Sequence, residues 1–118
     1  MEKKDLRERT KRFALKIIKA VEKLPKGRTA DIIGRQLLKS GTSVGANYRA
    51  ACRTRSTAHF ISKMGIVEEE ADESIYWMEL LIEAGLAPKE DWVSLMDEAN
   101  QLIAITVSSI KTAREYKK

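Results

Sequence analysis

The stretch FISKMGIVEEEADESIYWMELL, residues 60–81, decides the fold of this chain. Within it, apolar or small residues return at alternating steps of four and three. This heptad spacing keeps one face of an α-helix against a partner helix. The members of this seam are Phe60, Met64, Val67, Ala71, Ser74, Met78 and Leu81. Other apolar residues lie off the seam, so we expect the helix to contact neighbours on two sides: Ile61, Ile66, Ile75, Trp77, Leu80 and Ile82.

The flanking residues predict where this helix begins and ends. Ser56 or Thr57 is suited to cap its N-terminus, because a hydroxyl accepts a hydrogen bond from a backbone N–H of the first turn. At the other end, Gly85 tolerates the left-handed backbone that stops a helix, and Pro88 follows shortly after. The helix is therefore predicted to run from the capping residue to about Ala84.

Three more amphipathic patterns surround this helix. One spans residues 5–24 and ends at Pro25-Lys26-Gly27, a second starts near Thr29 as N-cap with Asp31 in the first turn, and the last starts after Pro88. All connections are short, so neighbouring helices should be antiparallel. The predicted fold is all-α, an up-down-up-down antiparallel four-helix bundle, with a single domain over residues 1–118.

The second helix has an unusually small middle, residues 40–46. Glycine lowers the stability of a helix by about 1 kcal/mol relative to alanine, so the presence of Gly41 and Gly45 inside this helix requires an explanation. Being four apart, they share one face, and close approach of a neighbouring helix would explain both. The competing interpretation is a break into two shorter helices at Gly41.

Charge divides the chain into two halves. Residues 1–55 hold 16 Lys and Arg against 5 Asp and Glu, a net charge of +11. Residues 56–118 hold 6 against 12, a net charge of −6, and the whole chain carries +5. A folded bundle would then be basic on one side and acidic on the other, which favours binding and assembly over catalysis.

The basic half supplies a candidate phosphate-binding surface. Arg49 and Arg53 are four apart on one helix face, and arginine suits bidentate phosphate contact and stacking on bases. The candidate nucleic-acid-binding residues are Lys16, Lys19, Arg28, Arg35, Lys39, Arg49, Arg53 and Arg55. No motif that reads a base sequence accompanies them, so binding would depend on backbone and shape. The alternative is that these cations are solvated or pair with the acidic third helix, within a chain or across an interface.

Catalytic and metal chemistry find little support. The acidic run Glu68–Glu73 suggests a di-iron bundle, but that site needs Glu-x-x-His motifs, and the sequence has one histidine, His59, outside any such motif. Cys52 has no convincing base nearby to make it a nucleophile. We expect no enzyme activity, no metal and no cofactor. Gln36, Asn47 and Glu73 should instead form a structural polar network, with Glu73 pairing with an arginine or with Asn47 on a neighbouring helix.

The cellular setting follows from what the sequence lacks. A single cysteine cannot form an intramolecular disulfide, and the charged start is followed by no apolar signal segment. The longest uncharged stretch, residues 99–110, is too short to span a membrane. We therefore expect a cytoplasmic protein with no membrane partner.

Residues 36–47, QLLKSGTSVGAN, resemble a bacterial family, as do Arg53, Ser56, Phe60-Ile61 and Glu73 beyond them. The family comprises four-helix-bundle proteins first met as open reading frames in intervening sequences of large-subunit ribosomal RNA genes. It is also similar to accessory proteins of diversity-generating retroelements. The turn at residues 24–27, LPKG, matches the family's Phe/Leu-Pro-Lys turn.

This resemblance implies a ring-like homopentamer with nucleic-acid binding as the leading activity. The chain departs from the family pattern at Ala50 and Ala51, where a Glu-Gly pair is common, and at Glu69-Glu70, where many members have Gly-Ser. The function predicted from the whole sequence is a non-enzymatic, homo-oligomeric accessory protein that binds RNA or DNA through its basic N-terminal half. The alternative is a protein–protein assembly module with no nucleic-acid role.

Overall fold

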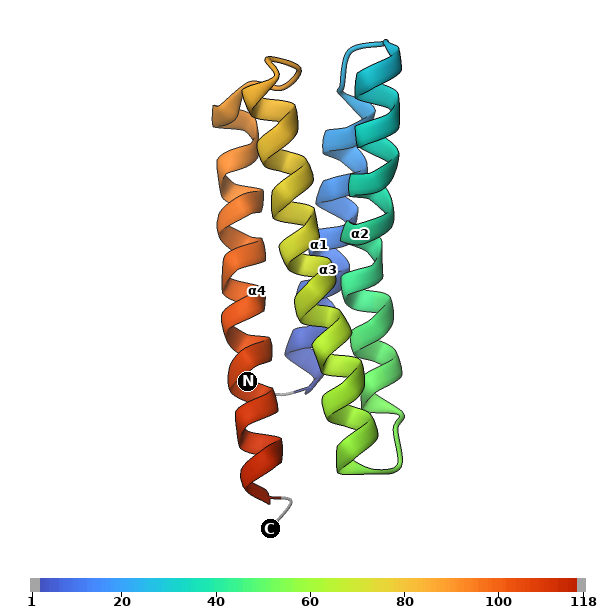
Figure 1. The fold of residues 1–118 in the computed structure, drawn as a ribbon, viewed down its shortest axis with the longest axis vertical. Coiled ribbons are helices and arrows are strands. Elements are labelled where there is room, and N and C mark those ends of the chain that lie inside the picture. Colours follow the sequence, from blue (N-terminus) through green and yellow to red (C-terminus); the bar gives the residue numbers. More distant parts are fainter. Residues whose placement is uncertain (1–2, 117–118) are drawn as a thin grey trace.

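Four helices occupy the part of the chain that the computed structural model describes, residues 3–116, with side chains described from residue 5. They are α1 (Lys3–Glu22), α2 (Arg28–Cys52), α3 (Thr57–Glu83) and α4 (Lys89–Tyr116). Figure 1 shows them running alternately up and down along a bundle that measures 51 × 21 × 20 Å. The predicted all-α, up-down-up-down antiparallel four-helix bundle is confirmed.

Each helix packs on its neighbours in the chain, and α4 returns to α1 to close the bundle. The side between α1 and α4 is the loosest of the four, and α2 and α4 lie on opposite sides in Figure 1. The heptad seam of α3 faces inward as predicted. Phe60 is half-buried and the other six members are buried: Met64, Val67, Ala71, Ser74, Met78 and Leu81.

The small segment of α2 serves close packing against α1. A Cβ atom added at Gly41 would lie 2.9 Å from Ile17 Cγ2, and one added at Gly45 would lie 3.2 Å from Thr10 Oγ1. Ile17 and Thr10 are themselves buried, so neither could move away freely. The close-approach interpretation is confirmed, whereas a break at Gly41 is wrong because α2 continues without interruption from Arg28 to Cys52.

The predicted capping residue and the predicted C-terminal end of α3 are both confirmed. The Ser56 side chain accepts a hydrogen bond from the backbone N–H of His59 at 3.1 Å. At the other end, Gly85 adopts φ 76°, the left-handed backbone that favours glycine. The N–H groups of Gly85 and Leu86 then donate to the carbonyls of Ile82 and Leu81, at 3.0 and 2.9 Å, in the Schellman pattern.

The predicted cap of α2 is wrong. The helix begins at Arg28 and its capping position is Gly27, which supplies no side-chain hydrogen bond. The N–H of Asp31 donates to the Gly27 carbonyl at 3.0 Å, so Thr29 already lies inside the first turn. The Thr29 hydroxyl therefore lies too far along the helix to accept hydrogen bonds from the free N–H groups of the first turn.

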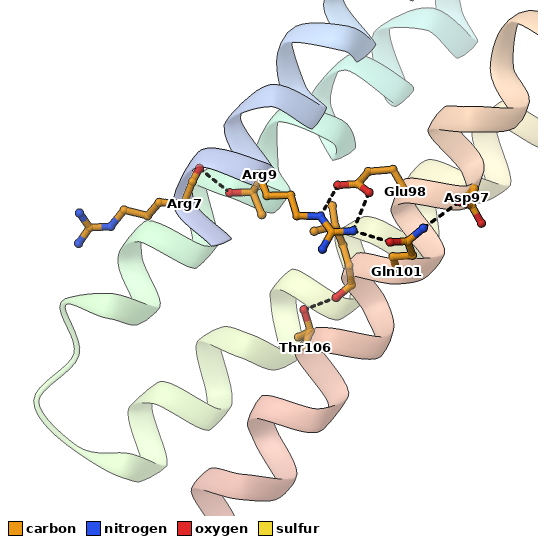
Figure 2. Close-up of polar contacts among 8 residues, drawn as sticks. Arg7, Arg9, Asp97, Glu98, Gln101 and Thr106 are labelled. Carbon is orange, nitrogen blue, oxygen red and sulfur yellow. Dashed lines mark hydrogen bonds and ion pairs between the residues drawn. The ribbon is translucent and has the colours of Figure 1, made fainter. Parts of the chain in front are cut away.

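A cluster of polar side chains links α1 to α4 on the loosely packed side of the bundle, as Figure 2 shows. We call it the clasp; its members are Arg9, Asp97, Glu98 and Gln101. The Arg9 guanidinium on α1 donates to both carboxylate oxygens of Glu98 on α4, at 2.7 and 2.8 Å, and to Gln101 Oε1 at 2.6 Å. Gln101 donates in turn to Asp97 at 2.8 Å. The hydrogen bond to Glu98 raises the pKa of Arg9, which stays charged. The side chains of Arg9 and Glu98 are only 21% and 23% exposed, so the pair is partly shielded from solvent.

Removing the clasp should loosen α1. We expect Arg9→Ala to lower the free energy of unfolding by roughly 1–2 kcal/mol, the range for a bidentate, partly shielded ion pair. Arg12→Ala, at an exposed position one turn away, is the control and should change it by less than about 0.5 kcal/mol. Urea unfolding of Arg9→Ala, Glu98→Ala and the double variant measures the coupling, and additive effects would contradict a direct interaction.

Candidate nucleic-acid interface

Five of the eight predicted cations form a row along the outside of α2 and at its C-cap, which we call the α2 ridge: Arg28, Arg35, Lys39, Arg49 and, at the C-cap, Arg53. All five are exposed, whereas Leu37, Val44 and Tyr48 on the opposite side of the helix are buried. With a rotation of 3.6 residues per turn, the directions of the four cations within α2 fall in a sector of about 80°, and the row from Arg28 to Arg53 is about 37 Å long. The ridge exists because the positions facing away from the core repeat along one continuous helix.

A groove between α1 and α2 adjoins this ridge and adds two cations that sequence reasoning left out of the site. It has a volume of 450 Å³, and Arg7, Lys11 and Arg49 line its edges. Small residues of α2 also line the groove and leave it open: Thr42, Gly45 and Ala46. The acidic Glu8 also lies at its edge. Figure 2 shows Arg7 pointing to the opposite side of α1 from Arg9.

The remaining three predicted cations lie elsewhere. Lys16 and Lys19 line a separate groove of 230 Å³ between α1 and α4, together with Lys23 and the acidic Asp91. Arg55 lies past the end of α2, in the turn that Figure 1 shows at the end of the bundle opposite the α1–α2 turn. The eight residues therefore do not share one surface, and the α2 ridge is the largest continuous set.

Among the described residues, no cation of the ridge forms an ion pair with α3, although the charge of Lys39 acts on Glu70 of that helix. Among the described side chains, the ion pairs are Arg9–Glu98 and Arg35–Asp31, the latter at 3.0 Å within α2. Arg35 and Asp31 are 77% and 59% exposed, so their attraction is weak and easily exchanged for another anion. Intrachain pairing of the basic half with the acidic third helix is therefore wrong for the part of the chain described. Pairing across an interface stays a prediction.

The acidic residues of α3 crowd one another. Glu69, Asp72, Glu73 and Glu79 are exposed, and Glu70 is half-buried beside them. Burial and then the charge of Glu73 raise the pKa of Glu70, while Lys39 and a hydrogen bond with Ser43 act in the opposite direction. Carboxylates held together in this way would gain from a cationic partner.

The predicted polar network of Gln36, Asn47 and Glu73 is not formed within the chain. Gln36 is exposed, Asn47 donates to the Ser43 carbonyl of its own helix at 2.8 Å, and Glu73 accepts from Trp77 Nε1 at 3.3 Å. The reason is that all three lie toward the rim of the α2–α3 interface, where each finds a partner on its own helix or in solvent.

The buried polar contact between α2 and α3 comes from two serines that sequence reasoning passed over. Ser74 Oγ donates to Ser40 Oγ at 2.9 Å, and both residues are buried. The available signals were the seam position of Ser74, the place of Ser40 in the small segment of α2, and the small size of both. A buried hydroxyl needs a partner, so this pair helps to fix the register of the two helices.

The groups considered for catalysis are dispersed. His59 is exposed in the first turn of α3, and Cys52 is half-buried at the end of α2. Burial and then the neighbouring Cys52 raise the pKa of Tyr48, which keeps its hydroxyl protonated. Among the described residues, no three of His, Cys, Asp and Glu lie together in a way that could hold a metal ion. Within the same residues, no helix has both the length and the apolarity required to cross a membrane.

These features define a class: a small all-α bundle whose second helix carries a row of exposed cations along its outer side. The model of the 23S rRNA-intervening sequence protein family matches residues 2–108, and the chain belongs to this family. The resemblance drawn from residues 36–47 and the segments after them is thereby confirmed.

A solved structure shares the fold over almost the whole chain. It is that of a protein of unknown function from the S23 ribosomal protein family of Bacteroides thetaiotaomicron. The two sequences are 33% identical, the TM-score is 0.84, and the match covers 90% of this chain and 98% of that one. No curated protein sequence matches the chain.

Proposed function

We propose that this protein is a non-enzymatic, homo-oligomeric accessory protein of the cytoplasm that binds nucleic acid. The observation that supports the proposal is the α2 ridge, whose five exposed cations form no ion pair with another helix within the described residues. The family name refers to intervening sequences of ribosomal RNA, which makes RNA a natural ligand.

The chemistry of the ridge suits phosphate better than bases. Its members are arginines and one lysine, which neutralise phosphates and release the counterions condensed on a polynucleotide. With Arg7 and Lys11 of the adjoining groove, seven cations lie on neighbouring surfaces of α1 and α2. Binding should therefore be independent of base sequence and strongly dependent on salt.

Fluorescence-anisotropy titration with structured RNA and with duplex DNA tests this function. We expect a dissociation constant of micromolar or tighter at about 50 mM salt, weakening steeply toward about 200 mM, as expected for a surface that contacts several phosphates. Absence of binding to either polynucleotide at the lower salt concentration would overturn the proposal.

The second candidate is a protein–protein assembly module, favoured by the crowded carboxylates of α3 and by half-exposed apolar side chains. Ile32 on α2 and Tyr76 on α3 are 54% and 52% exposed. A basic ridge and an acidic helix in one chain are complementary surfaces for self-association. Under this candidate, salt would change the oligomeric mass measured by light scattering, and no polynucleotide would bind.

A further inference from the structure

We infer that the α2 ridge takes a double helix rather than a single strand, lying along the length of α2. The inference rests on the proposed nucleic-acid binding and specifies the kind of polynucleotide. Both double-stranded RNA and double-stranded DNA present the required chemistry, a rigid array of phosphates.

The length and straightness of the ridge carry the first step. The α2 helix is unbroken from Arg28 to Cys52, so the directions and spacings of its outer cations are fixed. The ridge is about 37 Å long, and one turn of B-form DNA spans about 34–36 Å. A rigid row of cations gains most from a ligand whose phosphates are already ordered, because ordering a flexible strand costs entropy.

The absence of aromatic side chains from the ridge carries the second step. Non-specific binding of single strands relies on bases stacked on aromatic rings, at about 1–3 kcal/mol per base. The tyrosine of α2, Tyr48, is 3% exposed and faces the core. Among the described residues, the strongly exposed aromatic side chains are Tyr76 on α3 and Tyr116 at the end of α4, both outside the ridge. A single strand on α2 would therefore gain contacts with the cations but no stacking of its bases on aromatic rings.

The small residues between the two halves of the ridge carry the third step. Thr42 and Ala46 separate Lys39 from Arg49 on the outer side of α2, and with Gly45 they line the groove toward α1. A duplex backbone could thus approach the helix closely at its middle, with Arg7 and Lys11 reaching it from one side. Bulky side chains at these positions would hold a straight ligand away from the cations at both ends.

The test compares four probes at one salt concentration: RNA and DNA duplexes of about 20 base pairs, and oligouridylate and oligothymidylate of the same length, which form no duplex. We expect at least one duplex to bind about tenfold or more tightly than both single strands, since the single strands lack a stacking platform. Comparison of the affinities for the RNA duplex and the DNA duplex shows which of the two the ridge prefers. A hairpin stem of about 6 base pairs should bind more weakly than one of about 12, because the shorter stem cannot span the ridge.

Two results separate this inference from the proposed function. Single strands that bind as tightly as both duplexes, or more tightly, would overturn the preference for a double helix while leaving nucleic-acid binding intact. Absence of binding to all four probes would overturn both.

Discussion

Replacing Arg35, Lys39, Arg49 and Arg53 together with glutamine should weaken duplex binding by about 100- to 1,000-fold at low salt. These residues are four of the five members of the α2 ridge, and each is exposed on the outside of the helix. Glutamine keeps the length and helix propensity of the side chains, so the loss would come from the charge. Anisotropy titrations measure the change, and circular dichroism verifies that the helices persist.

The chain offers a matched control for this variant. The control uses three exposed cations of α1 and one just past its end: Arg12, Lys16, Lys19 and Lys23. The last three line the separate groove toward α4. Replacing these four with glutamine removes the same net charge from another surface. We expect this variant to weaken binding by less than about tenfold, since only the long-range attraction changes. Equal losses in the two variants would mean that net charge, and not the ridge, governs binding.

The substitution Gly41→Leu should lower the free energy of unfolding by about 3 kcal/mol or more. Even a Cβ atom at this position would lie 2.9 Å from Ile17 Cγ2, and Ile17 is fully buried between the helices. A whole leucine side chain would force α1 and α2 apart and strain the closely packed core. Thermal and urea unfolding measure the loss, and an unchanged melting temperature would contradict the close-approach explanation of the small segment.

A second glycine provides the control. Gly65 lies in the interior of α3, and a Cβ atom added there would meet no atom within 4 Å. Gly65→Ala should therefore raise the free energy of unfolding by about 1 kcal/mol, through helix propensity alone. The opposite signs expected at Gly41 and Gly65 separate packing from backbone effects.

The fold could be predicted from the sequence because its main signals are local and agree with one another. The alternating four-and-three spacing of α3 identified its buried seam, and Ser56 and Gly85 marked its ends. The prediction that Thr29 caps α2 is wrong because a residue can cap a helix only at the position where the backbone enters the helix. That point was set by the turn before α2 and not by the hydroxyl.

The site could be predicted only in part, because it depends on which side of a helix faces which neighbour. The i, i+4 spacing of Arg49 and Arg53 led to the ridge, although only Arg49 lies within α2 and Arg53 is the residue that caps its C-terminus. The clasp from Arg9 to Glu98 joins residues 89 positions apart, which no local pattern reveals. For the same reason, the orientation of Lys16 and Lys19 toward α4 became visible only once α1 was placed against its neighbours.

The most direct test of the central claim is the salt dependence of duplex binding, compared between the wild type and the variant that lacks Arg35, Lys39, Arg49 and Arg53. The slope of log affinity against log salt concentration counts the phosphates that the protein neutralises, at about 0.9 per phosphate for B-form DNA. If the α2 ridge contacts phosphates, the slope should become shallower by about 3 to 4 in the variant. An unchanged slope would contradict the account, because it would show that these four cations touch no phosphate.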